Sequence, residues 1–431
     1  MSQSKPLIER HRAVMPSWLT LLYEEPISLV RGKDRRVWDS DGNEYLDFFG
    51  GILTTISGHG VEEVIEAIRD QAGKILHTST LYLIESQIEL AEKIAELAPI
   101  PDAKVFFCTS GSEANEAALL LAASARGSNQ VLALRNSYHG RSFATVAVTG
   151  NRSWSPSAFS PLAVSYVHGG YMYRSPLGHL ADSEYIEAGA ADLRNVIETT
   201  TSGTIACMIA EPIQGVGGFA TPPDGYFGAM KEVLDEYGIL FISDEVQTGW
   251  GRTGEHFWGI EAHGVVPDAI TFAKGIGNGL SIAGVVARAE IMDSLTANSI
   301  STFGGNPLST AAALANLEYL LAHDLQGNAL KVGTHFKSAL RSATENVPAV
   351  GDVRGKGLMI GMELIQPPGK TPAPDAAGEV LEECRARGLL VGRGGLYGNV
   401  LRIAPPLSVT IEEADEAAEI ITKALAAVVS A

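Results

Sequence analysis

The feature that most constrains the fold is a regular alternation of short apolar runs and amphipathic segments across residues 104–322. The apolar runs have the length of single strands, and the segments between them show helical periodicity. Strands that alternate with helices predict an α/β fold with a mainly parallel sheet, because each parallel connection must cross the sheet. The predicted strands cover 104–108, 131–134, 205–210, 239–243, 269–272 and 284–287, and the predicted helices include 112–126, 225–237 and 308–322.

The pattern differs on either side of this region, which divides the chain into three parts. We predict an N-terminal segment (1–60) that contributes to a small domain, a large domain (61–325), and a C-terminal small α+β domain (326–431). Residues 151–190 are rich in Gly, Pro, Ser and Tyr and are predicted to form a long surface excursion. Further strands are predicted at 36–39, 44–47, 357–364, 388–391 and 400–403, and further helices at 61–76, 86–97, 329–346 and from Ile411, after the capping-box sequence 410–413.

Composition and charge exclude several classes of function. The 431 residues are 45% hydrophobic and 19% charged, as in a globular protein, and the net charge of −18 argues against a nucleic-acid partner. Cys108, Cys207 and Cys384 are widely spaced without the spacing of metal ligands, so we expect no metal site and a reducing, cytoplasmic location. No apolar stretch approaches the roughly 18 residues of a membrane span, and the N-terminus has no signal-like apolar region, so no membrane partner is expected.

Two polar features follow predicted strands, at the edge where such a sheet places its ligand. After the strand 104–108, Gly111 allows a tight turn, and Ser112 stands with free backbone N–H groups at the start of a helix, a combination that suits a phosphate. By itself such a turn is more often only a helix cap. Asp244 ends the strand 239–243, and a buried carboxylate there is costly unless a cation pairs with it. A protonated pyridine nitrogen is one such cation, and an arginine or a helix cap is an equally good alternative.

Two more features complete the set. Lys274 follows the strand 269–272 and is succeeded by the glycine-rich sequence 275–279, so a buried amine with a lowered pKa could form a Schiff base there. Alone, such a lysine would ordinarily be a solvated loop residue. Tyr138 and His139 follow the strand 131–134, where an aromatic ring could stack on a flat cofactor or simply belong to the core. A phosphate turn, an aromatic group, a buried Asp and a Lys, in this order, are the groups that pyridoxal 5'-phosphate (PLP) requires.

The chain resembles the class III (ω-amino acid type) aminotransferases of PLP fold type I over essentially its whole length. Within that family it is most similar to the alanine–glyoxylate (β-aminoisobutyrate–pyruvate) aminotransferase branch, on the sequences 245–249, 274–279 and 388–394. The segments that carry the family resemblance are 41–47, 110–115, 138–140, 211–215, 244–249, 273–275, 302–307, 351–357 and 401–406.

The resemblance implies a role for individual residues. Lys274 would form the Schiff base with the cofactor and then, as a free amine, carry the proton between the substrate α-carbon and the cofactor. Asp244 would keep the pyridine nitrogen protonated, and Arg402 would bind a substrate carboxylate. The remaining cofactor contacts implied by the family fall on Gly111, Ser112, Tyr138, His139, Gln247 and, from the partner subunit of a homodimer or a dimer of dimers, Thr302.

The sequence departs from the family pattern at two places. Members that use 2-oxoglutarate often carry a glutamate just after the sequence 211–215, where this chain has Val216, which favours a short acceptor such as pyruvate or glyoxylate. The usual Gly-His-x-His-Pro near the entrance is replaced by the sequence 58–61, so no substrate contact is inferred there. The donors β-alanine, β-aminoisobutyrate, alanine, 4-aminobutyrate and simple amines all remain candidates.

Other reaction classes use the same lysine and aspartate. Relatives of this branch include PLP phospho-lyases that act on amino-alcohol phosphates, as well as decarboxylases and aminomutases. Arg402 favours transamination, because an amino-alcohol phosphate has no carboxylate for it to bind. A non-catalytic PLP-fold protein would be expected to lack the lysine or the aspartate, and both are present.

Overall fold

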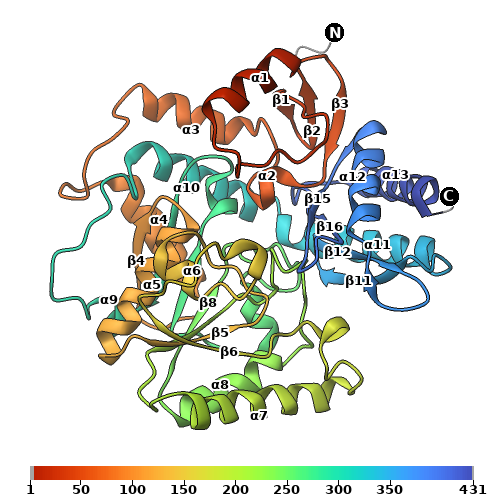
Figure 1. Ribbon diagram of the computed structural model, residues 1–431. Helices are drawn as coiled ribbons and strands as arrows, with labels where there is room; N and C mark the ends of the chain where they lie inside the picture. The colour runs from red at the N-terminus through yellow and green to blue at the C-terminus, as the bar shows by residue number, and fades with distance from the viewer. Residues whose placement is uncertain (1–3, 430–431) are drawn as a thin grey trace.

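The computed structural model describes residues 4–429 and contains three sheets (Figure 1). The largest has seven strands in the order β4-β10-β9-β8-β7-β5-β6. Strands β9, β8, β7, β5 and β6 run parallel, and β10 is antiparallel to both β9 and β4. The expected mainly parallel α/β sheet is therefore confirmed. Its strands are β4 (Ala103–Cys108), β5 (Gln130–Leu134), β6 (Ala163–Val167), β7 (Cys207–Ala210), β8 (Leu240–Asp244), β9 (Ala269–Phe272) and β10 (Ala283–Arg288).

Helices cover both faces of this sheet, which explains why its strands are apolar on both sides. Along β5, Leu132 and Leu134 belong to the core shared with helices α7 (Asp182–Thr200) and α8 (Tyr226–Glu236). Val131 and Ala133 point the other way, into a second core under helix α5 (Gly111–Arg126). Figure 1 shows α7 and α8 together beneath the strands and α5 on another side.

The predicted surface excursion at 151–190 is wrong in part. Its residues Ala163–Val167 form β6, which pairs in parallel with β5 at the edge of the large sheet, and Val167 is fully buried. The strand is hard to recognise in the sequence because Gly, Pro and Ser surround it and its edge position leaves Ala163 exposed. The segment also contains two short 3-10 helices, Arg152–Trp154 and Met172–Arg174, and it ends in the first turns of α7.

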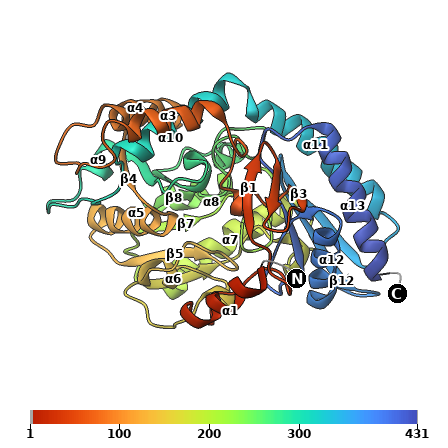
Figure 2. The ribbon, with the colours of Figure 1, turned by 90° about the horizontal axis from the view of Figure 1, so that it is seen from above.

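The two smaller sheets bring the chain ends together. A four-stranded sheet joins the N-terminal strands to the C-terminal part of the chain, because β3 pairs in parallel with β14. Figure 2 shows β1 and β3 next to the C-terminal elements. The boundaries predicted at residues 60 and 325 remain a prediction. The strands of these sheets are β1 (Leu29–Lys33), β2 (Arg36–Asp39), β3 (Glu44–Asp47) and β14 (Leu389–Leu390), and β11 (Val350–Lys356), β12 (Met359–Gln366), β13 (Thr371–Pro372), β15 (Gly392–Gly394) and β16 (Val400–Ile403).

Capping residues set the ends of several helices. In α13 (Ile411–Val429), the backbone N–H of Glu413 donates to the Thr410 hydroxyl and the Glu413 carboxylate accepts from the Thr410 N–H, which confirms the predicted capping box. The helix predicted at 61–76 ends earlier, with Gly73 as its C-cap. No helix within residues 4–429 is long and apolar enough to cross a membrane. The remaining helices are α1 (Ser4–Val14), α2 (Gly50–Leu53), α3 (Glu62–Ala72), α4 (Glu85–Leu97), α6 (Phe143–Ala147), α9 (Ala289–Met292), α10 (Pro307–Ala322), α11 (Leu325–Thr344) and α12 (Pro374–Ala386).

Candidate active site

Polar groups gather at the carboxyl edge of the large sheet, and Asp244 lies at their centre. Because β5, β7, β8 and β9 are parallel, the residues that follow them meet at one edge. Asp244 is the last residue of β8 and is only 4% exposed. One carboxylate oxygen accepts bonds of 2.7 Å from the Asn115 side-chain amide and lies 2.7 Å from His139 Nδ1, while the other accepts from the Val246 N–H. A buried carboxylate held this firmly can face a cation without moving.

His139 and Asn115 fix the orientation of that carboxylate from neighbouring elements. His139 follows β5, two strands from β8, and Asn115 lies in the first turns of α5. Because the carboxylate accepts, His139 Nδ1 is the donor, and the buried Nε2 makes no hydrogen bond to any described residue. The Asn115 oxygen accepts from the Thr271 hydroxyl at 2.6 Å, which fixes which end of the amide faces Asp244. The sequence marks Asn115 only as a member of the segment 110–115 and does not predict this contact.

The start of helix α5, where the sequence predicts a phosphate-binding turn, has free backbone N–H groups. Ser110 is its N-cap and accepts from the Glu113 N–H, which leaves the N–H groups of Gly111 and Ser112 free of hydrogen bonds to described residues. A Cβ on Gly111 would lie 3.1 Å from a Val246 methyl, and one on Gly140 would lie 2.5 Å from the Ser112 hydroxyl oxygen. The two glycines therefore let the chain close around the helix N-terminus, where a phosphate is favourable.

Lys274 stands beside this cluster in a strained conformation. It follows β9 and begins a 3-10 helix with a φ of 48°, a left-handed value that is uncommon for a residue with a side chain. Its amine makes no hydrogen bond or ion pair within residues 4–429. The pKa of Lys274 is lowered to about 8, mainly by desolvation. The charge of Arg402 also lowers this pKa, and the charges of Asp244 and Glu211 raise it. An amine with this pKa has a substantial neutral, nucleophilic fraction near neutral pH.

Glu211 is a second buried carboxylate at the same edge, and sequence reasoning gave it no role. It follows β7, is 4% exposed, and accepts from the N–H groups of Tyr138 and Gly215 at 2.9 and 2.8 Å. Burial raises the pKa of Glu211 to about 7, the nearby Asp244 also raises it, and His139 lowers it. Its signal in the sequence was the same as that of Asp244, since each is a carboxylate directly after a buried apolar strand.

Arg402 is a buried cation without a carboxylate partner. It lies in β16, is 5% exposed, and donates from Nη2 to the Gln247 side-chain oxygen at 2.8 Å, while its Nε has no partner among the described residues. The guanidinium carbon lies 4.7 Å from the ring centre of Phe219 and 5.4 Å from that of Phe49. Desolvation lowers the pKa of Arg402 to about 10, which Glu211 partly offsets. This environment suits a carboxylate brought by a substrate.

The other predicted residues lie in different settings. Tyr138 is half-buried, and its ring meets that of Trp154 edge to face at 5.3 Å. Thr302 is exposed in the segment between α9 and α10, and it makes no hydrogen bond to the cluster around Asp244. Cys108, Cys207 and Cys384 are buried free thiols, and no group of side chains within the described residues has the composition of a metal site.

A lysine of lowered pKa, a fixed carboxylate and a helix N-terminus at one sheet edge are the groups that a PLP enzyme of fold type I brings together. The chain belongs to the class-III aminotransferases, whose family model matches residues 23–425. These enzymes depend on PLP and transfer amino groups.

Curated relatives agree over nearly the whole chain. An alanine–glyoxylate aminotransferase 2 homolog of Arabidopsis thaliana is 41% identical and covers 95% of this chain and 84% of its own. The human alanine–glyoxylate aminotransferase 2 is 36% identical, with 97% of this chain and 86% of its own covered. A leucine/methionine racemase of Thermococcus litoralis is 38% identical, with coverage of 98% and 96%.

Solved structures share the fold. An (S)-enantioselective ω-transaminase from Thermomicrobium roseum is 35% identical, with a TM-score of 0.92 and 99% of each chain covered. An amine transaminase from an uncultivated Pseudomonas species, in its PLP-bound form, is 32% identical, with a TM-score of 0.88 and coverage of 94% and 95%. An Arthrobacter phospholyase in complex with phosphoethanolamine is 31% identical, with a TM-score of 0.89 and coverage of 97% and 99%.

Proposed function

We propose that this aminotransferase uses Lys274 to attach PLP and transfers an amino group from an ω-amino acid, alanine or a simple amine to pyruvate or glyoxylate. The observation that carries the proposal is the unpaired Lys274 amine, with its pKa lowered to about 8, at the same sheet edge as the fixed carboxylate of Asp244. When bound, PLP supplies an electron-withdrawing ring that stabilises negative charge on the substrate carbon.

The residues present fit this cofactor. Asp244 would hold the ring nitrogen in its protonated form, because its position is set by Asn115 and His139. The free N–H groups of Gly111 and Ser112 would hold the phosphate. Tyr138 and His139 would line one side of the ring, and Gln247 would contact the ring near its phenolic oxygen. Two observations support this fit: the buried Nε2 of His139 has no partner among the described residues, and Cβ atoms on Gly111 and Gly140 would fill space at the helix N-terminus.

Lys274 would perform the proton transfer once its amine is released. Burial makes a larger fraction of this amine neutral near pH 7 than in an ordinary lysine, so its Nζ can accept a proton from the substrate carbon and return one. The left-handed backbone at Lys274 fixes the direction from which the side chain enters the site. The roles of Lys274 as base and Asp244 as ring partner are separate, and each can be removed without the other.

Arg402 would bind the substrate carboxylate and so select the acceptor. Its nearest side-chain partner is the neutral Gln247, because Val216 stands where some relatives have a glutamate. An arginine that is not paired with a side-chain carboxylate favours a short keto acid, since the acceptor's own carboxylate can take the free donors. A strong preference for 2-oxoglutarate over pyruvate would contradict this assignment.

We further propose that the active unit is a homodimer or a dimer of dimers, with Thr302 contacting the cofactor phosphate of the partner subunit. Two exposed apolar segments support this arrangement. Leu83 and Phe303 are 93% and 62% exposed, and a ring contact of 5.1 Å between His77 and Phe303 joins the two segments into one surface. Sedimentation of the wild-type chain beside Phe303→Glu tests it, and a monomeric wild-type enzyme with full activity would refute it.

We place the enzyme in the cytoplasm, on the basis of its three free, buried thiols. The names of the plant and human relatives state that those proteins are mitochondrial. Small-molecule donors and acceptors are the proposed partners, with neither nucleic acid nor membrane. Fractionation of cells that express the full chain decides the location.

The decisive experiment supplies an amino donor and acceptor separately. Purified protein with PLP should accept an amino group from β-alanine and pass it to pyruvate, or from alanine and pass it to glyoxylate, with one oxo acid formed from the donor for each amino group moved. Release of inorganic phosphate from phosphoethanolamine without an acceptor would favour the phospho-lyase alternative. Exchange of the α-hydrogen of alanine without keto-acid formation would favour a racemase, as in the Thermococcus relative.

A further inference from the structure

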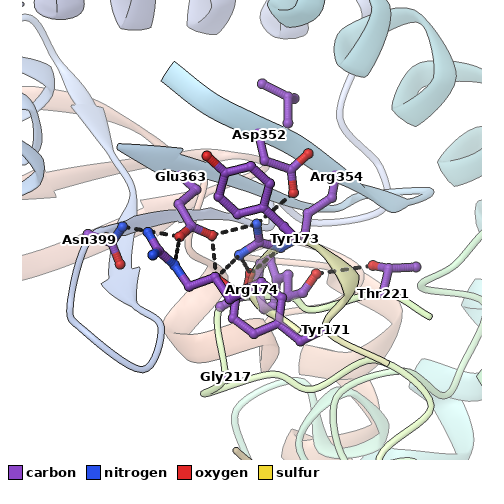
Figure 3. Close-up of polar contacts among 12 residues, drawn as sticks. Tyr171, Tyr173, Arg174, Gly217, Thr221, Asp352, Arg354, Glu363 and Asn399 are labelled. Carbon is purple, nitrogen blue, oxygen red and sulfur yellow. Dashed lines mark hydrogen bonds and ion pairs between the residues drawn. The ribbon is translucent and has the colours of Figure 1, made fainter. Parts of the chain in front are cut away.

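A buried network of charged side chains lies beside Arg402, the proposed binding site for the substrate carboxylate, and has no role in the proposed chemistry. Its centre is Glu363 of β12, whose side chain is 0% exposed. Arg174 Nε, Arg354 Nη1 and the Asn399 side-chain amide donate to it at 2.5, 2.8 and 3.2 Å, and the Tyr171 hydroxyl donates as well. Figure 3 shows the two arginines converging on this carboxylate from opposite sides.

Of these donors, Arg354 has a second set of contacts that reaches the substrate side. Its Nε and Nη2 both donate to the backbone carbonyl oxygen of Gly218, at 3.1 and 2.8 Å. Asp352 and Glu363 hold the other end of the guanidinium at 2.8 Å each. The Nη1 end of Arg354 is therefore fixed by two carboxylates. Its Nε and Nη2 form a planar pair of donors that holds one loop, residues 215–219.

The loop 215–219 provides or holds several of the groups that surround Arg402. Phe219 lies against the Arg402 guanidinium, the Val216 carbonyl accepts from the Gly395 N–H at 3.0 Å, and the Gly215 N–H donates to Glu211. Gly361 is the cross-strand neighbour of Arg402, and a Cβ there would lie 2.7 Å from the Gly218 carbonyl oxygen. The loop thus rests directly on the sheet beside Arg402, and only a glycine at 361 permits that approach.

We propose that Arg354, fixed by Glu363, is a positioning residue for substrate carboxylate binding: its grip on Gly218 holds Phe219 and Glu211 in place around Arg402. The inference rests on the proposed role of Arg402 in the transaminase. Arg174 supplies the matched control, because it donates to the same carboxylate but its second contact is the Lys370 carbonyl, not the loop. Replacing either arginine removes one positive charge from Glu363, and only one replacement releases the loop.

The test compares Arg354→Met with Arg174→Met in the PLP-loaded full chain. Propionate serves as a probe, because it has a carboxylate but neither the keto group of pyruvate nor an amino group. Its Kd is measured by calorimetry. We expect Arg354→Met to raise that Kd and the KM for pyruvate by about tenfold or more, since displaced groups bind poorly, with kcat changed far less. Arg174→Met should change both by about twofold or less, in line with an unmoved loop.

Two further variants keep the test decisive if Arg354→Met does not fold. Arg354→Lys preserves the charge near Glu363 but has no planar pair of donors for Gly218, and Gly361→Ala pushes the same carbonyl without removing a charge. Both should weaken propionate binding in a protein that folds and has a normal PLP spectrum.

Specific outcomes would overturn the inference. Equal effects of Arg354→Met and Arg174→Met would show that only the charge matters, and an unchanged propionate Kd in Arg354→Lys and Gly361→Ala would show that the loop does not position the site. A wild-type enzyme that ignores propionate would overturn it too. A wild-type protein that binds propionate in an Arg354-dependent way but moves no amino group would instead refute the proposed function and leave the positioning role standing.

Discussion

The lowered pKa of Lys274 leads to a quantitative prediction about how the apoprotein takes up PLP. Covalent attachment requires the neutral amine. With a pKa of about 8 in place of the ordinary 10.5, about a tenth of the amines are neutral at pH 7, compared with about 3 in 10,000 for an ordinary lysine. The attachment rate at pH 7 should therefore exceed that of an unperturbed lysine by about 300-fold, other factors being equal.

The pH profile gives the test. The second-order rate of covalent attachment, followed by the appearance of the visible band after mixing apoprotein with PLP, should rise about tenfold per pH unit up to pH 7 and level off above about pH 8. Arg402 lowers the pKa of Lys274 and Asp244 raises it, so Arg402→Met should move the midpoint to higher pH and Asp244→Asn to lower pH.

The two variants should shift the midpoint pH in opposite directions in the same assay. This separates the effect of charge from general damage to the site. A rate that keeps climbing tenfold per unit to pH 10 would show that the lysine is solvated and would refute the reasoning. Shifts of the same sign in both variants would refute the assigned electrostatic contacts.

The remaining predictions concern the carboxylates, the start of α5 and the small domain. Asp244→Asn should lower kcat by about 10²- to 10³-fold while PLP still attaches to Lys274, as judged by borohydride trapping and steady-state rates; unchanged turnover would contradict the role of the charge. Arg402→Met should raise the KM for pyruvate by about ten- to a hundredfold, because hydrogen bonds to a charged group contribute about 1.5–3 kcal/mol, and an unaltered KM would exclude it from carboxylate binding. Gly140→Ala should weaken PLP binding, since the added Cβ lies 2.5 Å from the Ser112 oxygen at a φ of 137°, whereas Gly127→Ala, also at positive φ but with open space around it, should leave PLP affinity unchanged in the same equilibrium dialysis. Thr410→Ala removes one half of the capping box of α13 and should lower the free energy of unfolding by about 1 kcal/mol in urea titrations, with activity unaffected in the folded protein.

The alternation of strands and helices was sufficient to predict the parallel sheet, because runs such as β7 and β9 are short, almost wholly apolar and buried from end to end. The edge strand β6 was missed because its residues are only partly covered and its neighbours look like a loop. The start of α11 at Leu325 was placed too late, although Asp324 caps it by accepting from the Gly327 N–H.

At the site, it was easier to predict which residues belong to it than which of them contact one another. Lys274 and Asp244 stand out because a charged residue directly after a buried strand needs a reason to be there. Contacts between distant elements were not predictable. The His139–Asp244 contact joins residues 105 apart in the chain, and Gln247 faces Arg402 across 155 residues. The Arg354–Gly218 contact ends on a backbone carbonyl, for which the sequence offers no signal at all.

One measurement tests the central claim most directly: the absorbance spectrum of the purified protein with PLP, first with an amino donor alone and then with pyruvate, alongside Lys274→Ala. The account predicts a visible band that disappears with β-alanine or alanine, returns with pyruvate, and shows no such cycle in the variant. A wild-type protein without a visible band after PLP is added, or a Lys274→Ala variant that cycles normally, would contradict it.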